Sequence, residues 1–525
     1  MGRLGDGEKL LYSDRLWILG LSIAAIALYT SRLGDVPLRD WDEGIVAGVA
    51  RNIWRGFPDD TWLYPTINYG QPYWNKPPLI HWLIAGAYSL FGVSEWSTRL
   101  FPALLSALSV PLLYKIGREL FSFHTAAISA LVYLTLLPIA RHGRVAMLDG
   151  AIACWFCLAV WCMLRGRRDR RWLLGTGLGI GLICLTKGIM MGVLLGGIIV
   201  IFLLWDSPKL LFSPFLWISL ALGIAPAIAW YVLQYLHYGN EFLGISLGKQ
   251  TFNRIWQPVS NTSNPPWYYL LEIAKYTLPW LIFLPKGIQL AVKNRHLSWS
   301  KLALVWSGVY LLATSLMATK LPWYIVPIYP GLSLLIGASL AIAWQEKIYP
   351  NSWKSLCLVT AVSSIATIYL SLTGLESDLT FILVLVTLGM AIASILLWLS
   401  NRYFIPVLII TFYLALLLLF NSSHWLWELN EAFPVQPVAE VINQNVPPRQ
   451  KIYTAYHNIR PALEFYSDRV IIPASDNELK QTWQQQPAYL LLDTDAIDRL
   501  NLKSYRILGN ERDDVTWQLI TQADN

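Results

Sequence analysis

Apolar residues run along most of the chain in stretches long enough to cross a lipid bilayer, which takes about 20 mostly apolar residues in a helix. Thirteen such stretches lie at 16–33, 98–116, 124–140, 147–164, 172–186, 189–205, 213–236, 267–285, 300–317, 322–343, 355–373, 379–400 and 403–422. One more apolar run, 78–92, is amphipathic and suits the membrane surface. The pattern predicts an all-α polytopic membrane protein.

Composition supports this class. Hydrophobic residues make up 55% of the 525 residues and charged residues 14%, whereas soluble domains carry about 25% charged residues. A freely soluble or disordered chain is therefore excluded. The net charge of +7 fits the basic cytoplasmic loops of membrane proteins. We therefore expect the chain to lie in a lipid bilayer and not to bind nucleic acid.

The basic loops set the predicted orientation. If 78–92 does not cross, every basic cluster between spans falls on one side, including the densest one at 165–171. We expect the protein in the cell membrane, that is, the plasma or inner membrane. By the positive-inside rule the N-terminus then lies in the cytoplasm and the C-terminus on the opposite, external side. The first span follows a basic segment and is expected to be a retained signal anchor.

Three segments lie outside the predicted spans: the external loop 34–97, the loop 237–266 with Lys249 and Arg254, and the tail 434–525. The external loop 34–97 is rich in Trp, Tyr and Pro, with helical stretches at 43–55 and 78–92. From 434 onward the apolar runs shorten to strand length and alternate with polar helical stretches. We therefore expect a transmembrane catalytic domain at 1–433, which includes the loop, and a small soluble extracytoplasmic α/β domain at 434–525.

Ionisable groups at the rim of a membrane are costly and indicate function. On the predicted outer side they include Asp40, Asp42, Glu43, Lys76, Arg141, His142, Arg144, Asp149, Lys187 and Lys320, and Tyr324 follows shortly after Lys320. Several have simpler explanations when taken alone. Asp42 and Glu43 could begin a surface helix, where the helix dipole favours acids. Lys76 and Lys320 could be interfacial lysines, and Arg144 could anchor the end of a helix. Asp149 and Lys187 interrupt apolar runs, which such explanations do not cover.

Together these groups predict a chemistry. Lysine and arginine bind phosphate, a carboxylate beside them suits a general base, and apolar helices suit a lipid tail. A divalent cation between Asp42 and Asp149 is compatible with this set, although no ligand spacing requires one, and no other cofactor is expected. The alternative is a transporter or flippase for a lipid-linked sugar, without transferase activity. The chain shows no internal repeat, and its ionisable residues gather at one rim, which favours the enzyme.

Five short motifs, in order, resemble the polyprenyl-phosphate-dependent GT-C glycosyltransferases, in particular the bacterial aminoarabinose lipid A transferases and the protein O-mannosyltransferase-like group. They are Trp41-Asp42-Glu43, Lys76-Pro77-Pro78-Leu79 with Arg99-Leu100-Phe101-Pro102-Ala103, Arg144 to Asp149, Leu185-Thr186-Lys187-Gly188, and Lys320-Leu321-Pro322-Trp323-Tyr324. Val46 and His81 stand where tyrosines are common in that family, so the resemblance does not identify the sugar or the acceptor.

The resemblance implies an inverting transfer of a hexosyl or pentosyl group from a polyprenyl-phosphate donor to a hydroxyl of a lipid, glycan or protein acceptor in the cell envelope. It matches Asp42 to the catalytic base, with Glu43 as its neighbour and Asp149 as a second acidic position. It matches Lys76 to the lipid phosphate. From position and charge we add Arg144, Lys187, Lys320 and Tyr324 as expected phosphate- or sugar-binding residues.

Overall fold

The computed structural model describes residues 6–68, 70–258, 264–374, 376–425, 435–448, 450–455, 460–485, 487–502, 504–511 and 517–522. The chain divides into two compact units. The first contains residues 1–33, 74–79 and 100–426, and the second contains 34–73, 80–99 and 427–525. The predicted domain boundary at 433–434 lies outside the described residues.

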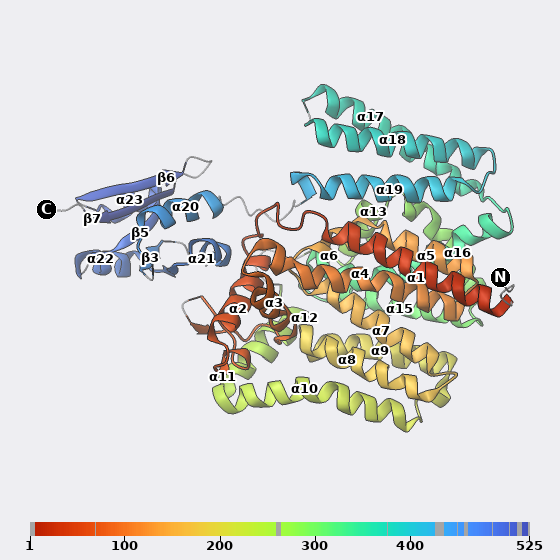
Figure 1. Ribbon diagram of the computed structural model, residues 1–525, viewed down its shortest axis with the longest axis horizontal. Helices are drawn as coiled ribbons and strands as arrows, with labels where there is room; N and C mark the ends of the chain where they lie inside the picture. The colour runs from red at the N-terminus through yellow and green to blue at the C-terminus, as the bar shows by residue number, and fades with distance from the viewer. Residues whose placement is uncertain are drawn as a thin grey trace, which may run out of the picture. The chain divides into compact units, whose positions relative to one another are not determined.

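The first unit is built from apolar helices, most of which overlap stretches that the sequence pattern predicts (Figure 1). They are α1 (Asp6–Thr30), α4 (Glu95–Leu120, whose first turn belongs to the second unit), α5 (Phe123–Leu134), α6 (Leu137–Arg144), α7 (Asp149–Arg165), α8 (Leu173–Lys187), α9 (Ile189–Asp206), α10 (Pro214–Tyr238), α13 (Tyr268–Thr277), α14 (Leu284–Lys293), α15 (Ser298–Leu316), α16 (Tyr329–Gln345), α17 (Ser355–Leu372), α18 (Ser377–Trp398) and α19 (Phe404–Phe420). The stretch 124–140, predicted as one span, is instead divided into two helices that meet at a bend. The stretch 267–285, predicted as one span, instead forms α13, the 3-10 helix η5 (Trp280–Phe283) and the start of α14. The chain breaks at Leu278–Pro279, because proline cannot continue the hydrogen-bond ladder of a helix.

Six helical segments among the described residues are long and apolar enough to cross a membrane, or seven if the pair α5 and α6, bent by 58°, counts as one span. Several of them expose apolar side chains. On α17, for example, Leu358, Val362 and Ile365 are 59–69% exposed. Large apolar surfaces of this kind suit contact with lipid, and they agree with the membrane class that the composition predicts.

A chain of short elements connects α10 to α13 in the first unit. It comprises α11 (Asn240–Leu243), the π-helix η4 (Gly244–Phe252) and α12 (Asn253–Trp256). The backbone N–H groups of Ala318 and Thr319 donate to the carbonyl oxygens of Ile255 and Arg254, at 2.8 and 3.1 Å. These bonds fix α12 against the segment that leads into the 3-10 helix η6 (Pro322–Ile328).

The second unit contains the external loop and the C-terminal segment. The loop forms α2 (Asp42–Gly56), the short η1 (Asp60–Trp62), a two-stranded ribbon of β1 (Thr66–Ile67) and β2 (Gln71–Pro72), and α3 (Leu79–Phe91). Both helices lie where amphipathic stretches predict them. Apolar residues of α2 and α3, among them Val49, Ile53 and Ala85, share one buried cluster.

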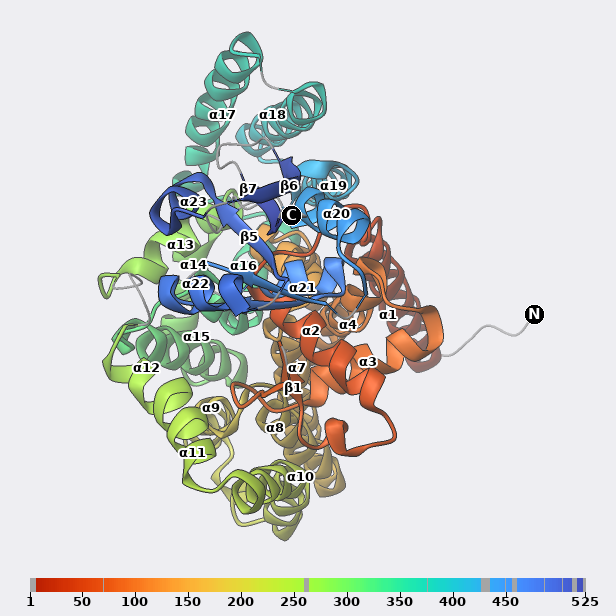
Figure 2. The ribbon, with the colours of Figure 1, turned by 90° about the vertical axis from the view of Figure 1, so that its left-hand side faces the viewer.

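The C-terminal segment forms a five-stranded mixed sheet in the order β4-β3-β5-β7-β6. Figure 2 shows its strands β5, β6 and β7. The strands are β3 (Lys451–Thr454), β4 (Val470–Pro473), β5 (Tyr489–Asp493), β6 (Tyr505–Glu511) and β7 (Trp517–Gln522), and the helices are α20 (Val435–Asn445), α21 (Pro461–Ser467), α22 (Asp476–Gln485) and α23 (Thr494–Leu500). Leu491 packs in one apolar core with α20 and α21, whereas Leu490 and Leu492 pack in another with α22 and α23. Helices therefore cover both faces of the sheet, which accounts for the continuous apolar run in β5.

Candidate functional site

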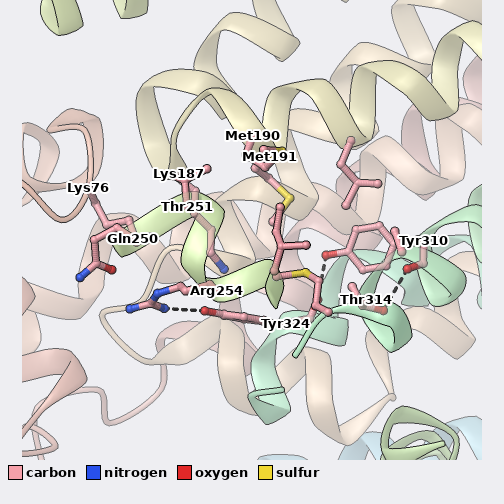
Figure 3. A pocket seen from close by; sticks show the side chains of 14 residues that line it. Lys76, Lys187, Met190, Met191, Gln250, Thr251, Arg254, Tyr310, Thr314 and Tyr324 are labelled. Atoms are coloured by element: carbon pink, nitrogen blue, oxygen red, sulfur yellow. Dashed lines mark hydrogen bonds between the residues drawn. The ribbon is translucent and has the colours of Figure 1, made fainter. Parts of the chain in front are cut away.

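A cavity of about 280 Å³ in the first unit brings together three cations (Figure 3). They are Lys76, Lys187 and Arg254, and each comes from a different segment of the chain. The rest of the lining is mainly apolar and comprises Met190, Met191, Leu194, Gln250, Thr251, Ile255, Tyr310, Ala313, Thr314, Met317 and Tyr324. An anionic group attached to a long apolar chain matches both parts of this lining.

Lys187 is the last residue of α8, and the following Gly188 has φ of +103°, a conformation that glycine adopts without strain. This turn leads directly into α9 and leaves the Lys187 side chain at the cavity. Its ammonium nitrogen lies 2.5 Å from Oδ1 of Asp149 and 4.7 Å from the ring centroid of Tyr324. Asp149 is 2% exposed and is the first residue of α7, where the helix dipole favours a carboxylate.

Arg254 and Tyr324 form the opposite part of the site. A guanidinium N–H of Arg254 donates to the Tyr324 hydroxyl oxygen at 2.6 Å. The Tyr310 hydroxyl donates to the backbone carbonyl of Tyr324 at 2.7 Å, and the Tyr269 hydroxyl donates to that of Leu321 at 3.1 Å. These contacts hold the segment Leu321–Tyr324 in place, so that the side chain of Tyr324 has one direction.

Lys76 is half-buried in the loop before α3. Burial, together with the neighbouring charges of Arg254 and Lys187, lowers the pKa of Lys76 to about 7, and the carboxylate of Asp149 opposes this shift. A lysine with this pKa gains a proton readily when an anion enters the site. An anion bound in the cavity would therefore favour the charged form of Lys76.

Two predicted residues of the first unit do not line this cavity. Lys320 is 5% exposed and donates to the carbonyl oxygen of Met317 at 2.5 Å. Arg144, fully buried, donates to the carbonyl oxygens of Leu28 and Ser31, and its guanidinium lies 4.4 Å from the ring centroid of Phe420. Arg144 thus links α6 to the end of α1.

The predicted base and its neighbour lie in the second unit, at the start of α2. Asp42 is partly exposed and is the first residue of the helix. Glu43 is fully buried, and its two carboxylate oxygens accept hydrogen bonds from Nε and Nη2 of Arg99 at 2.8 and 2.7 Å. The two acids therefore differ in environment, since one is accessible and the other is the partner of a buried cation.

Sequence reasoning missed Arg254. It stands in an irregular part of the loop 237–266, where a single cation follows no periodicity. The one indication in the sequence was that Arg254 lies on the predicted outer side of the membrane. The same is true of Lys249, which does not line the cavity, so this indication does not single out Arg254. Within the described ranges, no group of three or more His, Cys, Asp or Glu side chains is placed to hold a metal ion. The divalent cation stays a prediction.

Comparisons with known proteins support the resemblance that the motifs indicate. Residues 75–232 match the dolichyl-phosphate-mannose-protein mannosyltransferase family. The crystal structure of ArnT from Cupriavidus metallidurans bound to undecaprenyl phosphate superimposes with a TM-score of 0.81, at 21% identity, and the match covers 96% of this chain and 98% of that one. The chain therefore has an ArnT-like fold. It resembles the polyprenyl-phosphate-dependent GT-C glycosyltransferases.

Curated sequences agree with this resemblance. An uncharacterized protein of Aquifex aeolicus is 27% identical over 86% of this chain and 86% of its own length. The undecaprenyl phosphate-alpha-4-amino-4-deoxy-L-arabinose arabinosyl transferase of Erwinia tasmaniensis is 31% identical over 56% of this chain and 54% of its own length. The chain thus aligns with little more than half of that arabinosyl transferase.

Proposed function

We propose that the protein is an integral-membrane glycosyltransferase, which moves a sugar from a polyprenyl-phosphate donor to an acceptor hydroxyl with inversion at the anomeric carbon. The observation that carries the proposal is the convergence of Lys76, Lys187 and Arg254 on one cavity with apolar lining. The family likeness supports it, because the superimposed ArnT structure is described as bound to undecaprenyl phosphate.

The charges of the cavity favour the departing phosphate over the donor. Three cations and the carboxylate of Asp149 leave two net positive charges when Lys76 is protonated. The donor is a phosphate diester with one negative charge, and the departing polyprenyl phosphate gains a second as its bond to the sugar breaks. Interactions that strengthen in this way lower the barrier, because they are stronger in the transition state than in the ground state.

In the proposed reaction, Asp42 accepts the proton of the acceptor hydroxyl. The hydroxyl oxygen then bonds to the anomeric carbon from the face opposite the phosphate, and the electron pair of the broken bond stays on the phosphate oxygen. Lys76, Lys187 and Arg254 take up that charge, and Tyr324 orients Arg254. The apolar side chains of Met190, Met191 and Leu194 would contact the first units of the polyprenyl chain.

The same proposal includes the finer architecture. We propose thirteen spans, a cytoplasmic N-terminus and an extracytoplasmic C-terminal α/β domain at 434–525. Reporter fusions test this orientation: a C-terminal alkaline phosphatase should be active, and a fusion after Arg168, in the basic loop that follows α7, should be inactive. The opposite pattern would contradict the orientation without affecting the chemistry.

Purified protein with defined donors tests the reaction itself. Undecaprenyl phosphates that carry a hexose or a pentose are incubated with envelope lipids, glycans and proteins, and mass spectrometry detects new glycosides and released undecaprenyl phosphate. Arg254→Gln should lose most transfer, whereas Arg295→Gln, an exposed arginine outside the cavity, should retain it. Movement of the donor across vesicles without a new glycosidic bond would favour a flippase instead. Activity that persists after exhaustive chelation would contradict the predicted divalent cation.

A further inference from the structure

The backbone on both sides of Asp42 is held by side chains from distant parts of the second unit. Arg99, which is fully buried, donates to the carbonyl oxygens of Val36 and Pro37 at 2.6 and 2.8 Å, in addition to its two bonds with Glu43. The backbone N–H of Arg39 also donates to Oε2 of Glu43, at 3.0 Å. The residues before and after Asp42 are therefore joined through one ion pair.

The C-terminal segment holds the same stretch from another direction. A guanidinium N–H of Arg460 donates to Oδ2 of Asp40 at 2.8 Å, and the backbone N–H of Ala462 donates to the Asp40 carbonyl at 3.3 Å. The N–H of Leu38 donates to the Tyr466 hydroxyl at 2.7 Å. Asp40 is 3% exposed, so its contact with Arg460 is largely protected from water.

The helices α2 and α21 also pack at close range. A Cβ atom at Gly44 would lie 2.5 Å from the backbone nitrogen of Ala462, closer than real Cβ contacts. About two turns further along α2, Arg51 donates to the carbonyl oxygens of Phe465 and Glu464 at 2.9 and 3.2 Å. Glycine at position 44 permits this approach, and Arg51 supplies donors to the last turn of α21, where the Glu464 carbonyl also accepts from the backbone N–H of Asp468.

We propose that residues 460–468, within the C-terminal segment, position Asp42. The soluble domain would thereby take part in the transfer reaction through α2. This rests on the proposed function, in which Asp42 is the base. A general base must lie within hydrogen-bond reach of the proton that it accepts. Arg460, Tyr466 and Gly44 are then positioning residues, because they touch the segment around Asp42.

Arg460→Ala is the direct test, with Arg499→Ala as its control. Arg499 lies in the same C-terminal segment, is exposed, and pairs with Asp476 at 3.5 Å. Arg460→Ala should lower kcat by about tenfold or more, the scale of a small misplacement of a catalytic group. The KM for the donor should stay nearly unchanged, because the donor cations are in the first unit. Arg460→Lys should restore part of kcat, and Tyr466→Phe, which keeps the ring, should lower kcat in the same direction.

Hydrogen exchange of the full-length protein provides a readout that needs no activity. Peptides covering Leu38–Gly44 should exchange faster in Arg460→Ala and should be unchanged in Arg499→Ala. Unchanged exchange in Arg460→Ala would overturn the positioning role even if the protein transferred no sugar. Faster exchange with an unaltered kcat, or with only a raised donor KM, would overturn it as well. A wild-type protein inactive with every donor, but with the predicted exchange pattern, would instead contradict the proposed function.

Discussion

The ammonium of Lys187 lies 2.5 Å from a carboxylate oxygen of Asp149, and both side chains are less than 10% exposed. The two residues are 38 positions apart, and each interrupts an apolar stretch. Their pairing explains how a buried lysine and a buried aspartate coexist in a membrane protein, since each neutralises much of the cost of burying the other. It also leaves Lys187 beside the ring of Tyr324.

The pair should be sensitive to the loss of either member. Asp149→Asn leaves the Lys187 charge buried without its carboxylate, and such losses cost about 3–5 kcal/mol of stability. The double variant Asp149→Asn/Lys187→Met should be more stable than Asp149→Asn alone. Thermal unfolding in detergent measures both. Equal stability of the single and double variants would contradict a coupled pair.

The hydrogen bond between Arg254 and Tyr324 should contribute to phosphate binding. Tyr324→Phe removes the acceptor hydroxyl and keeps the ring, and a hydrogen bond to a charged group contributes about 1.5–3 kcal/mol. We expect weaker binding of undecaprenyl phosphate by about tenfold or more, measured by calorimetry in detergent. Tyr235→Phe is the control, because Tyr235 is exposed on α10 and does not line the cavity. Equal affinities of the two variants would exclude this role for Tyr324.

Lys76 should make donor binding depend on pH. Because its pKa is lowered to about 7, Lys76 is charged below pH 7 and loses its charge above it in the free protein. A bound phosphate favours the charged form and raises that pKa, so affinity should fall as pH rises above 7, by up to about tenfold per unit until the bound-state pKa is reached. A nonreactive phosphonate monoanion keeps the ligand charge constant over this range. Lys76→Met should flatten the slope, and an unchanged slope would contradict the assignment.

Replacing Glu43 and replacing Asp42 should have different effects on the stability of the protein. Glu43→Gln leaves the buried Arg99 without its carboxylate, so we expect a loss of about 3 kcal/mol or more of stability together with activity. Asp42→Asn should leave stability nearly unchanged, because Asp42 is partly exposed. Unfolding temperatures and protease sensitivity distinguish the two. A Glu43→Gln protein as stable as wild type would contradict a structural role for that carboxylate.

The sequence predicted the helices well because apolar runs of membrane length have few other structures available to them. It also predicted that Lys76, Asp149, Lys187 and Tyr324 matter, and the structure brings these four residues to one site. Arg254 was missed, since a cation in an irregular loop has no pattern. Arg144 and Lys320 were expected at the phosphate, but the direction of a side chain at a helix end cannot be read from its position. Their guanidinium and ammonium groups contact backbone carbonyls instead.

The contacts that hold the backbone around Asp42 were also beyond the sequence. Arg99 was noted as part of a motif, but nothing in the pattern indicated that its guanidinium joins Glu43 to residues 36 and 37. The contacts of Asp40 with Arg460 and of Leu38 with Tyr466, just before α2, connect residues more than 400 positions apart. Such contacts depend on the tertiary fold, which spacing along the chain does not determine.

Transfer by Asp42→Asn measures the central claim most directly. Purified wild-type and Asp42→Asn proteins are given the same undecaprenyl-phosphate sugar and acceptor, and the new glycoside and released undecaprenyl phosphate are quantified, with donor binding measured in parallel. The account predicts that the variant binds the donor with wild-type affinity and forms no detectable glycoside. Wild-type rates of glycoside formation by Asp42→Asn would contradict it.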